Sequence, residues 1–214
     1  ARPPKTPPGG TPMRRRIALV VVRAASPAQA RSTTQVNDIL AHLSTHTQGR
    51  ADFTQTRENP ALAAPQVSHG DLLFVIGHGM LWHTRDPFDD TLVLTSGRTA
   101  RLTTEGRVER VQDANRGVTQ VSAMLQGLLA GHADEALRQF DVAADGTLTQ
   151  WTLRFTPRQA RMARVLAGIT LRGGEFLDAI EVDLANGERT RTVSANTRDA
   201  APLNPLETKA LGVP

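Results

Sequence analysis

Short apolar segments separated by turn signals dominate the middle of this chain and leave few folds open to it. Between Gly70 and Gln112 the sequence runs through GDLLFVIGHG, MLWHT, TLVLTSG, RTARLTT and RVERVQ, and Gly, Asp or Pro bounds each segment. Those bounding residues favour turns, and segments of this length and composition favour strands. Strands so close together in sequence pair antiparallel, because parallel pairing needs a long crossover connection.

Further segments extend the pattern on both sides of this region. We expect additional strands over Asp52–Arg57, Phe140–Ala143, Gln150–Thr156, Ile169–Arg172, Ala179–Leu184 and Arg189–Ala195. Apolar residues at helical spacing predict helices over Thr34–Gln48, Val118–Ala130 and Asp134–Phe140, with Arg158–Leu166 as a further candidate. The predicted fold is mainly β, of the α+β class, with about ten strands in one curved antiparallel sheet and two or three helices against one face.

The basic residues of the chain are unevenly distributed. Lys and Arg number 25 against 21 Asp and Glu, but six of the basic residues and none of the acidic ones lie among the first thirty residues. The rest of the chain is near neutral, so we expect no nucleic-acid partner. The chain has no cysteine, which excludes disulfides and thiolate metal sites, and nothing in the sequence calls for a cofactor.

The first thirty residues have the order of a secretory signal. Met13 and three arginines precede an apolar run over Ile17–Val22, and the small-x-small sequence Ala28-Gln29-Ala30 follows. We therefore predict export and a mature protein that begins near Arg31, with a disordered basic tail as the alternative. The expected organisation is an extension with the signal at 1–30, a folded domain at 31–200 and a C-terminal tail at 201–214 without regular structure.

Several motifs follow one another in a set order between about Thr34 and Ala195. They are Phe53-Thr54-Gln55 (F-x-Q), Gly70–Phe74 (G-x-L-x-F), Leu81-Trp82, a strand over Leu92–Gly97 that ends in a glycine turn, the Leu-rich helix Val121–Leu129, and the Pro-bounded strand Trp151–Pro157. This series resembles the periplasmic lipoprotein carriers of the LolA/LolB-like family. The resemblance implies an unclosed β-barrel with helices as a lid, which shields the acyl chains of lipoproteins between the inner and outer membranes.

The resemblance also implies partners and a mechanism. We expect a periplasmic monomer, not an enzyme, that takes a lipoprotein or lipid cargo from an inner-membrane donor transporter to an outer-membrane acceptor. Carriers of this family hold the lid closed with an arginine shortly before the Trp-bearing strand, but that position is Ile76 here. We therefore expect the polar latch to be absent and lid closure to rest on apolar contacts, chiefly those of the Val121–Leu129 helix. The motif F-x-Q-x-R, with Arg57 as its arginine, resembles that of a divergent branch of the family whose genes lie near aryl-polyene and pigment lipid biosynthesis genes. A polyene conjugate is therefore a candidate cargo.

Twelve apolar residues are candidates for the lining of such a cavity. Strand alternation places residues 72 and 74 on one face of their strand, and residues 80 and 82 on one face of the next. Packed core is the alternative interpretation of these faces, and the resemblance is what favours a pocket. The set is Phe53, Leu72, Phe74, Met80, Trp82, Leu92, Leu94, Met124, Leu128, Trp151, Leu153 and Phe155.

Few polar residues suggest a site. Arg57 is a candidate for binding a cargo headgroup or closing the lid, and an ordinary surface arginine is the alternative. His42 and His46 have the i, i+4 spacing of metal ligands, but no third ligand is evident, so we interpret both as surface residues. No nucleophile with a placed base is visible. Two other functions stay open: a periplasmic sensor or adaptor that binds lipids or lipoproteins, and an exported lipid-modifying enzyme.

Overall fold

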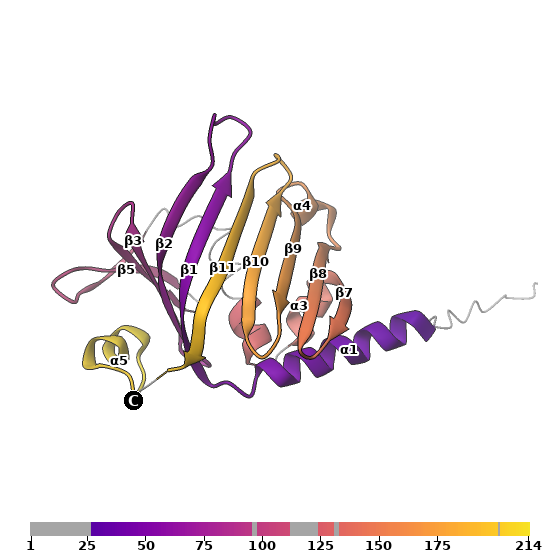
Figure 1. Ribbon diagram of the computed structural model, residues 1–214, viewed down its shortest axis with the longest axis horizontal. Helices are drawn as coiled ribbons and strands as arrows, with labels where there is room; N and C mark the ends of the chain where they lie inside the picture. The colour runs from indigo at the N-terminus through magenta and orange to yellow at the C-terminus, as the bar shows by residue number, and fades with distance from the viewer. Residues whose placement is uncertain (1–26, 96–97, 112–123, 131–132, 201) are drawn as a thin grey trace, which may run out of the picture.

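A computed structural model describes residues 27–95, 98–111, 124–130, 133–200 and 202–214 (Figure 1). The strands are β1 (Gln48–Glu58), β2 (Gln66–Val75), β3 (Gly79–Asp86), β4 (Asp90–Thr95), β5 (Arg98–Leu102), β6 (Val108–Arg110), β7 (Phe140–Thr147), β8 (Gln150–Pro157), β9 (Leu166–Gly173), β10 (Leu177–Leu184) and β11 (Arg189–Asp199). The helices are α1 (Pro27–Leu43), α3 (Ala133–Gln139), α4 (Ala160–Ala163) and α5 (Pro205–Leu211), and residues 124–129 are also helical.

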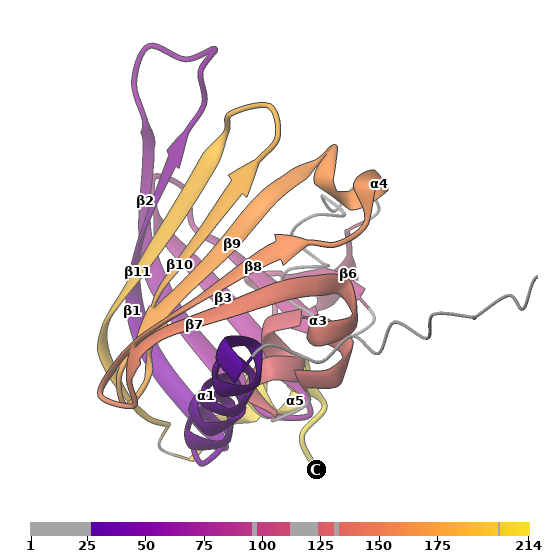
Figure 2. The same ribbon diagram turned by 90° about the vertical axis from the view of Figure 1, so that its right-hand side faces the viewer.

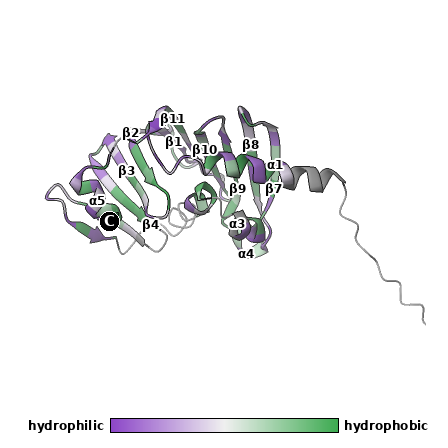
Figure 3. Ribbon diagram, turned by 90° about the horizontal axis from the view of Figure 1, so that it is seen from below, coloured by the Kyte–Doolittle hydropathy of each residue, from purple (hydrophilic) through white to green (hydrophobic). Residues whose placement is uncertain are grey.

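All eleven strands belong to one antiparallel sheet with the order β6-β5-β4-β3-β2-β1-β11-β10-β9-β8-β7. The strands β1–β6 and β7–β11 each form a meander of hairpins, and the first and last strands pair in the centre of the sheet, from Gly49 opposite Asp199 to Glu58 opposite Arg189. The edge strands β6 and β7 do not pair with each other, so the curved sheet stays open (Figure 3). The predicted fold class, an unclosed antiparallel barrel with helices, is confirmed.

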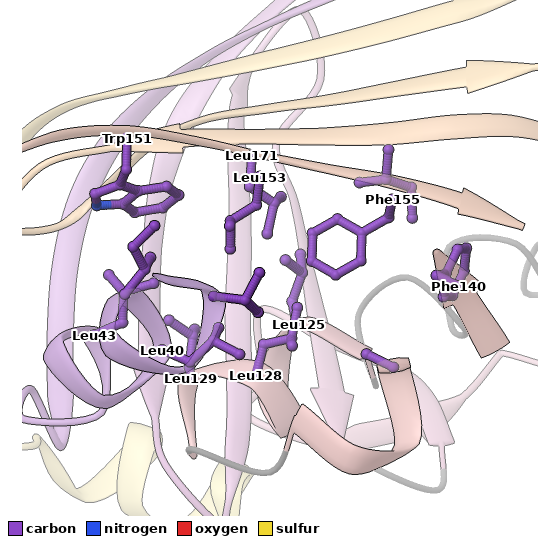
Figure 4. Packing of buried hydrophobic residues seen from close by; sticks show 14 residues of the cluster. Leu40, Leu43, Leu125, Leu128, Leu129, Phe140, Trp151, Leu153, Phe155 and Leu171 are labelled. Atoms are coloured by element: carbon purple, nitrogen blue, oxygen red, sulfur yellow. The ribbon is translucent and has the colours of Figure 1, made fainter. Parts of the chain in front are cut away.

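Helices cover the concave face of the sheet. The helices α1 and α3 lie on this side, where the arc of strands opens (Figures 2 and 3). Trp151, Leu153 and Phe155 alternate along β8 and are at most 1% exposed. They face α1 and helix 124–129, which contribute Val36, Ile39, Leu40, Leu43, Leu125, Leu128 and Leu129 (Figure 4). This concave core holds the helices against the sheet.

A second core lies on the convex face of the sheet. Its presence explains why the sequences of β2 to β4 contain nearly continuous apolar runs. The odd-numbered residues of these strands point away from the concave core and pack with Ala100 of β5 against Ala210 and Leu211 of α5. A strand that is buried on both faces needs apolar residues on both. The members from β2, β3 and β4 are Leu73, Val75, Leu81 and Val93.

The prediction of an irregular C-terminal tail is wrong, because α5 occupies Pro205–Leu211. Asn204 and Glu207 form a reciprocal capping box at its start, and Gly212 ends it in the left-handed conformation at φ 64°. Arg50 on β1 then fixes the helix to the sheet through two hydrogen bonds to Glu207, at 2.8 and 2.7 Å. A seven-residue helix has no sequence periodicity to reveal it, and its stability comes from these caps and contacts.

Other boundaries differ modestly from the expectations. The first helix ends at Leu43 and not at Gln48, because Gln48 already begins β1. It begins at Pro27, so processing at Ala30 would trim its first four residues. Residues 1–26, the Ser96-Gly97 turn and the first part of the predicted Val118–Ala130 helix, with Val121, lie outside the described residues. No helix in the described part of the chain combines the length and the apolarity that a membrane crossing requires.

Candidate functional site

A cavity of about 40 Å³ lies on the concave face, between the sheet and the helices that cover it. Its wall is the sheet and its roof is formed by α1 and helix 124–129, while residues of the α1–β1 and β9–β10 turns line one end. The lining is mostly apolar and comprises Leu43, His46, Ala51, Leu72, Phe74, Met80, Trp82, Leu125, Leu129, Phe176, Leu177, Ile180, Ser194 and Thr197.

Strand register brings the residues of the cavity wall together. Ala51, Leu72 and Trp82 stand opposite one another on β1, β2 and β3, and Phe74 stands opposite Met80. Directly paired residues in a sheet point to the same side. Gly49, the partner of Phe74 on β1, leaves room for its ring, since a β-carbon at Gly49 would meet that ring at 2.4 Å. The phenyl group therefore lies across β1 and forms part of the wall.

The structure divides the twelve predicted apolar residues into three groups. Leu72, Phe74, Met80 and Trp82 line the cavity. Phe53 is buried beside it, with its ring centroid 4.3 Å from that of Trp82. Leu92 and Leu94 pair with Trp82 and Met80 and continue the same face onto β4. The remaining members belong to the concave core or pack against it, namely Met124, Leu128, Trp151, Leu153 and Phe155.

Sequence reasoning missed the residues from the α1–β1 and β9–β10 turns at one end of the cavity. The interpretation of His46 as a surface residue is wrong, because its side chain is 15% exposed and lines the cavity. Its Nδ1 lies 2.9 Å from an Asp199 carboxylate oxygen, and its ring centroid lies 4.2 Å from that of Phe176. The i, i+4 spacing of His42 and His46 did not point to the cavity, because α1 ends at Leu43 and His46 lies beyond it, and no local pattern marks Phe176. Helical periodicity could have predicted the roof residues Leu125 and Leu129, because both leucines lie on one side of the predicted helix.

Comparison with known families identifies the chain. The family described as "Outer membrane lipoprotein carrier protein LolA-like" matches residues 25–211. The chain belongs to this family. The resemblance predicted from the ordered motifs is thereby confirmed, and the match covers the sheet, the helices over the concave face and α5.

Several solved structures are similar to this LolA-like chain at low identity. A LolA superfamily protein from Nitrosomonas europaea is 9% identical, with a TM-score of 0.47 over 81% of this chain and 97% of that one. A DUF1329 family protein from Desulfovibrio piger is 10% identical, with a TM-score of 0.48 over 87% and 100%. The lipoprotein LppX of Mycobacterium tuberculosis is 9% identical, with a TM-score of 0.41 over 84% and 100%. No curated protein sequence matches the chain.

The LolA-like chain has a polar contact between its covering helix and the sheet. Gln126, on helix 124–129, donates a hydrogen bond from Nε2 to the backbone oxygen of Leu94 at 3.0 Å. This hydrogen bond adds a polar contact to the apolar contacts that the sequence predicted for this helix. Ile76 lies in the β2–β3 turn, where its backbone N–H donates to the oxygen of Thr47. The polar contact thus comes from the helix, and not from the position of the missing arginine.

Arg57 lies away from the cavity of the LolA-like fold. It is six residues along β1 from Ala51, which corresponds to about 20 Å of strand. Its guanidinium is half exposed and lies 3.2 Å from the Glu188 carboxylate, which also accepts a hydrogen bond from Asn59. Glu188 therefore already balances the charge that a headgroup would need. Among the described residues, no group of three or more His, Asp or Glu is arranged to hold a metal ion.

The size of the cavity limits what this conformation can hold. A cavity of about 150 Å³ accepts a molecule such as benzene. The cavity here, at about 40 Å³, has room for a few water molecules but not for an acyl chain. Since α1 and helix 124–129 form the roof, a larger ligand requires that part of the roof move away from the sheet.

Proposed function

We propose that this LolA-like protein is a periplasmic carrier that shields the acyl chains of a lipoprotein or lipid-like cargo during transfer towards the outer membrane. The observation that carries the proposal is the apolar cavity beneath a separate helical roof, in a chain whose family is that of the lipoprotein carriers. In this role the protein binds and releases its cargo without chemical change. An inner-membrane donor supplies the cargo, and an outer-membrane acceptor receives it.

The energetics of opening suit such a carrier. Leu125, Leu128 and Leu129 are nearly fully buried, so lifting helix 124–129 costs several kcal/mol at about 1.5–3 kcal/mol for each leucine. Burial of an acyl chain contributes about 0.8 kcal/mol of favourable binding free energy for each CH₂. A chain of ordinary length therefore offsets the cost of opening, whereas a short one does not. The empty protein stays closed, and cargo binding shifts it to the open form.

Filling the cavity tests the proposal. Ala51 is buried on the cavity side of β1, so Ala51→Leu would place a larger side chain in the space that cargo needs. We expect this variant to bind a palmitoyl-chain lipid at least about tenfold more weakly than the wild-type protein, in a displacement assay with a hydrophobic fluorescent probe. Ala195→Leu, on the exposed convex side of β11 opposite Asp52, is the matched control and should bind normally.

Two outcomes would contradict the carrier proposal. One is a wild-type protein that binds neither the probe nor the lipid. The other is an Ala51→Leu variant that binds the lipid normally while its thermal melt shows a folded protein. Equal weakening in both leucine variants would also count against a ligand site on the concave face.

The proposed location has its own test. If the segment from Met13 to Ala30 is a signal, then material from the periplasm of the native host should begin near Arg31. N-terminal sequencing decides this. A cytoplasmic product that retains Met13 would contradict export.

A further inference from the structure

The side of β11 that faces the concave interior is unusual because it carries polar residues. Its residues alternate, and register places Thr190, Thr192 and Ser194 opposite Arg57, Gln55 and Phe53 of β1 on the concave side. No apolar side chain of β11 points this way among those three positions, although β11 lies in the centre of the sheet. The neighbouring strand β10 places Ile180 and Val182 opposite Thr192 and Thr190. A polar stripe thus runs along β11, beside the apolar residues of β10.

A β-bulge extends the stripe into the cavity. Arg50 pairs with Arg198 and Asp52 pairs with Ala195, so Asn196 and Thr197 together stand opposite Ala51 alone. Asn196 takes the left-handed conformation at φ 53° and turns outward, where its amide donates to Asp52 at 2.8 Å. The extra residue changes the alternation, which brings Thr197 to the concave side with Ser194.

The hydroxyls of this stripe differ in their partners. Thr192 is 4% exposed, and its hydroxyl accepts a hydrogen bond from Gln55 at 3.1 Å. Ser194 and Thr197 line the cavity, and their hydroxyls have no hydrogen-bond partner within the described part of the chain. Together with the ring of His46, these hydroxyls line the cavity and can donate a hydrogen bond to a ligand.

The same end of the cavity lies close to solvent. The ring of His46 lines the cavity beside Phe176. One of its nitrogens lies against the carboxylate of Asp199, which is 70% exposed, so His46 lies between the cavity and solvent. From this end the wall becomes apolar along Leu72 and Trp82. A ligand with one polar end therefore matches the cavity in one orientation, with its polar end at Thr197 and His46.

We propose that Ser194 and Thr197 bind the ester or amide carbonyl that joins an acyl chain to its headgroup. The carbonyl oxygen accepts hydrogen bonds from the two hydroxyls, the headgroup leaves the cavity past His46 and Asp199, and the acyl chain extends along Leu72 and Trp82 under the roof. This inference rests on the proposed carrier function and adds the orientation of the cargo and the chemical class of its linkage.

A pair of matched lipids tests the inference. The palmitoyl ester of glycerol has the carbonyl, and the hexadecyl ether of glycerol has the same headgroup and chain length without it. We expect the wild-type protein to bind the ester about tenfold more tightly, since each neutral hydrogen bond contributes about twofold to tenfold. The double variant Ser194→Ala with Thr197→Val should bind the ester only as tightly as the ether, and its affinity for the ether should be unchanged.

Thr170→Val is the control for the loss of a strand hydroxyl. Thr170 lies on β9 between Ile169 and Leu171, which face the concave core, so its own side chain points to the convex side. This variant should keep the preference for the ester. The inference is overturned if the wild-type protein binds both lipids equally, or if the double variant keeps the ester preference. If the wild-type protein binds neither lipid, the proposed carrier function fails instead.

Discussion

At the scale of single residues, the carboxylate of Glu207 both caps α5 and binds the arginine that fixes this helix to the sheet. It closes the capping box of α5 by accepting a hydrogen bond from the backbone N–H of Asn204, and it binds the guanidinium of Arg50. The hydrogen bond from Arg50 lowers the pKa of Glu207 below its ordinary value of 4.5, against the opposing effect of burial. A carboxyl with a depressed pKa stabilises the folded state above its ordinary pKa, and this stability is lost as the pH falls through the lowered value.

Glu207→Gln should therefore destabilise the protein in a pH-dependent way. Glutamine retains the capping hydrogen bond but not the charge, so the free energy of unfolding should fall by about 2 kcal/mol at neutral pH. Below the lowered pKa the wild-type carboxyl is itself neutral, so the difference should vanish in strong acid. Urea denaturation at both pH values measures this. A difference of the same size in acid would mean that the ion pair is not its cause.

Gly70 shows how one missing side chain positions the aromatic residues beside the cavity. A β-carbon there would meet the backbone oxygen of His83 at 1.9 Å and the ring of Phe53 at 2.8 Å. We expect Gly70→Ala to cost about 3 kcal/mol in urea denaturation, because the backbone carbonyl cannot move aside. Gly77→Ala is the comparison, since Gly77 has φ 79° but open space around it, and should cost about 1 kcal/mol. Equal losses would show that the close approach at Gly70 is unimportant.

At the scale of elements, both roof helices are attached to the sheet by apolar and polar contacts, and helix 124–129 is one of them. Its leucines pack in the concave core, and Gln126 reaches the backbone of β4. Gln35 makes a similar contact from α1, where its Nε2 donates to the oxygen of Gly146 at 2.7 Å. The two glutamines allow the two roof helices to be loosened separately.

Gln126→Leu should make helix 124–129 open more readily. Loss of a hydrogen bond of about 1 kcal/mol corresponds to amide exchange about fivefold faster, as measured by hydrogen–deuterium exchange of the empty protein. Gln35→Leu is the control and should affect α1 instead. Added lipid should change the exchange of helix 124–129 in the wild-type protein. Strong protection that lipid leaves unchanged would show that this helix is ordinary core, in contradiction to the carrier mechanism.

At the scale of the whole molecule, the sheet buries apolar side chains on both faces. The concave face carries the cavity and its roof, and the convex face of β2 to β5 is covered by α5. The two faces share the same strands, so α5 supports the wall of the cavity from behind. Figure 1 shows α5 on the side of the sheet where β3 and β5 lie, away from α1 and α3.

Deletion of residues 202–214 should expose the convex core. Leu73, Leu81 and Val93 would lose the cover of Ala210 and Leu211, and Arg50 would lose its partner. A contiguous exposed apolar patch favours association, so we expect the truncated protein to self-associate in size-exclusion chromatography with light scattering. A truncated protein that stays monomeric and melts at the wild-type temperature would show that α5 is dispensable.

Local sequence pattern was sufficient for most strands, their turns and the inward face of β2 and β3. Leu72, Phe74, Met80 and Trp82 were predicted as cavity residues because alternation is a property of each strand alone, and the family's ordered motifs include Leu72, Phe74 and Trp82. The helices over the concave face followed in the same way from the spacing of their leucines. These features depend on residues close together in the chain.

Only the tertiary structure determined which apolar residues line the cavity and which pack in the concave core. The cavity depends on the pairing of β1 with β11, which joins Gly49 to Asp199 from opposite ends of the domain. That pairing contains the bulge that brings Thr197 inward, and it places Asp199 beside His46. The docking of α5 on β3 and β4 is equally distant in sequence. Such contacts leave no periodic trace in the chain, because they depend on the complementarity of surfaces that folding brings together.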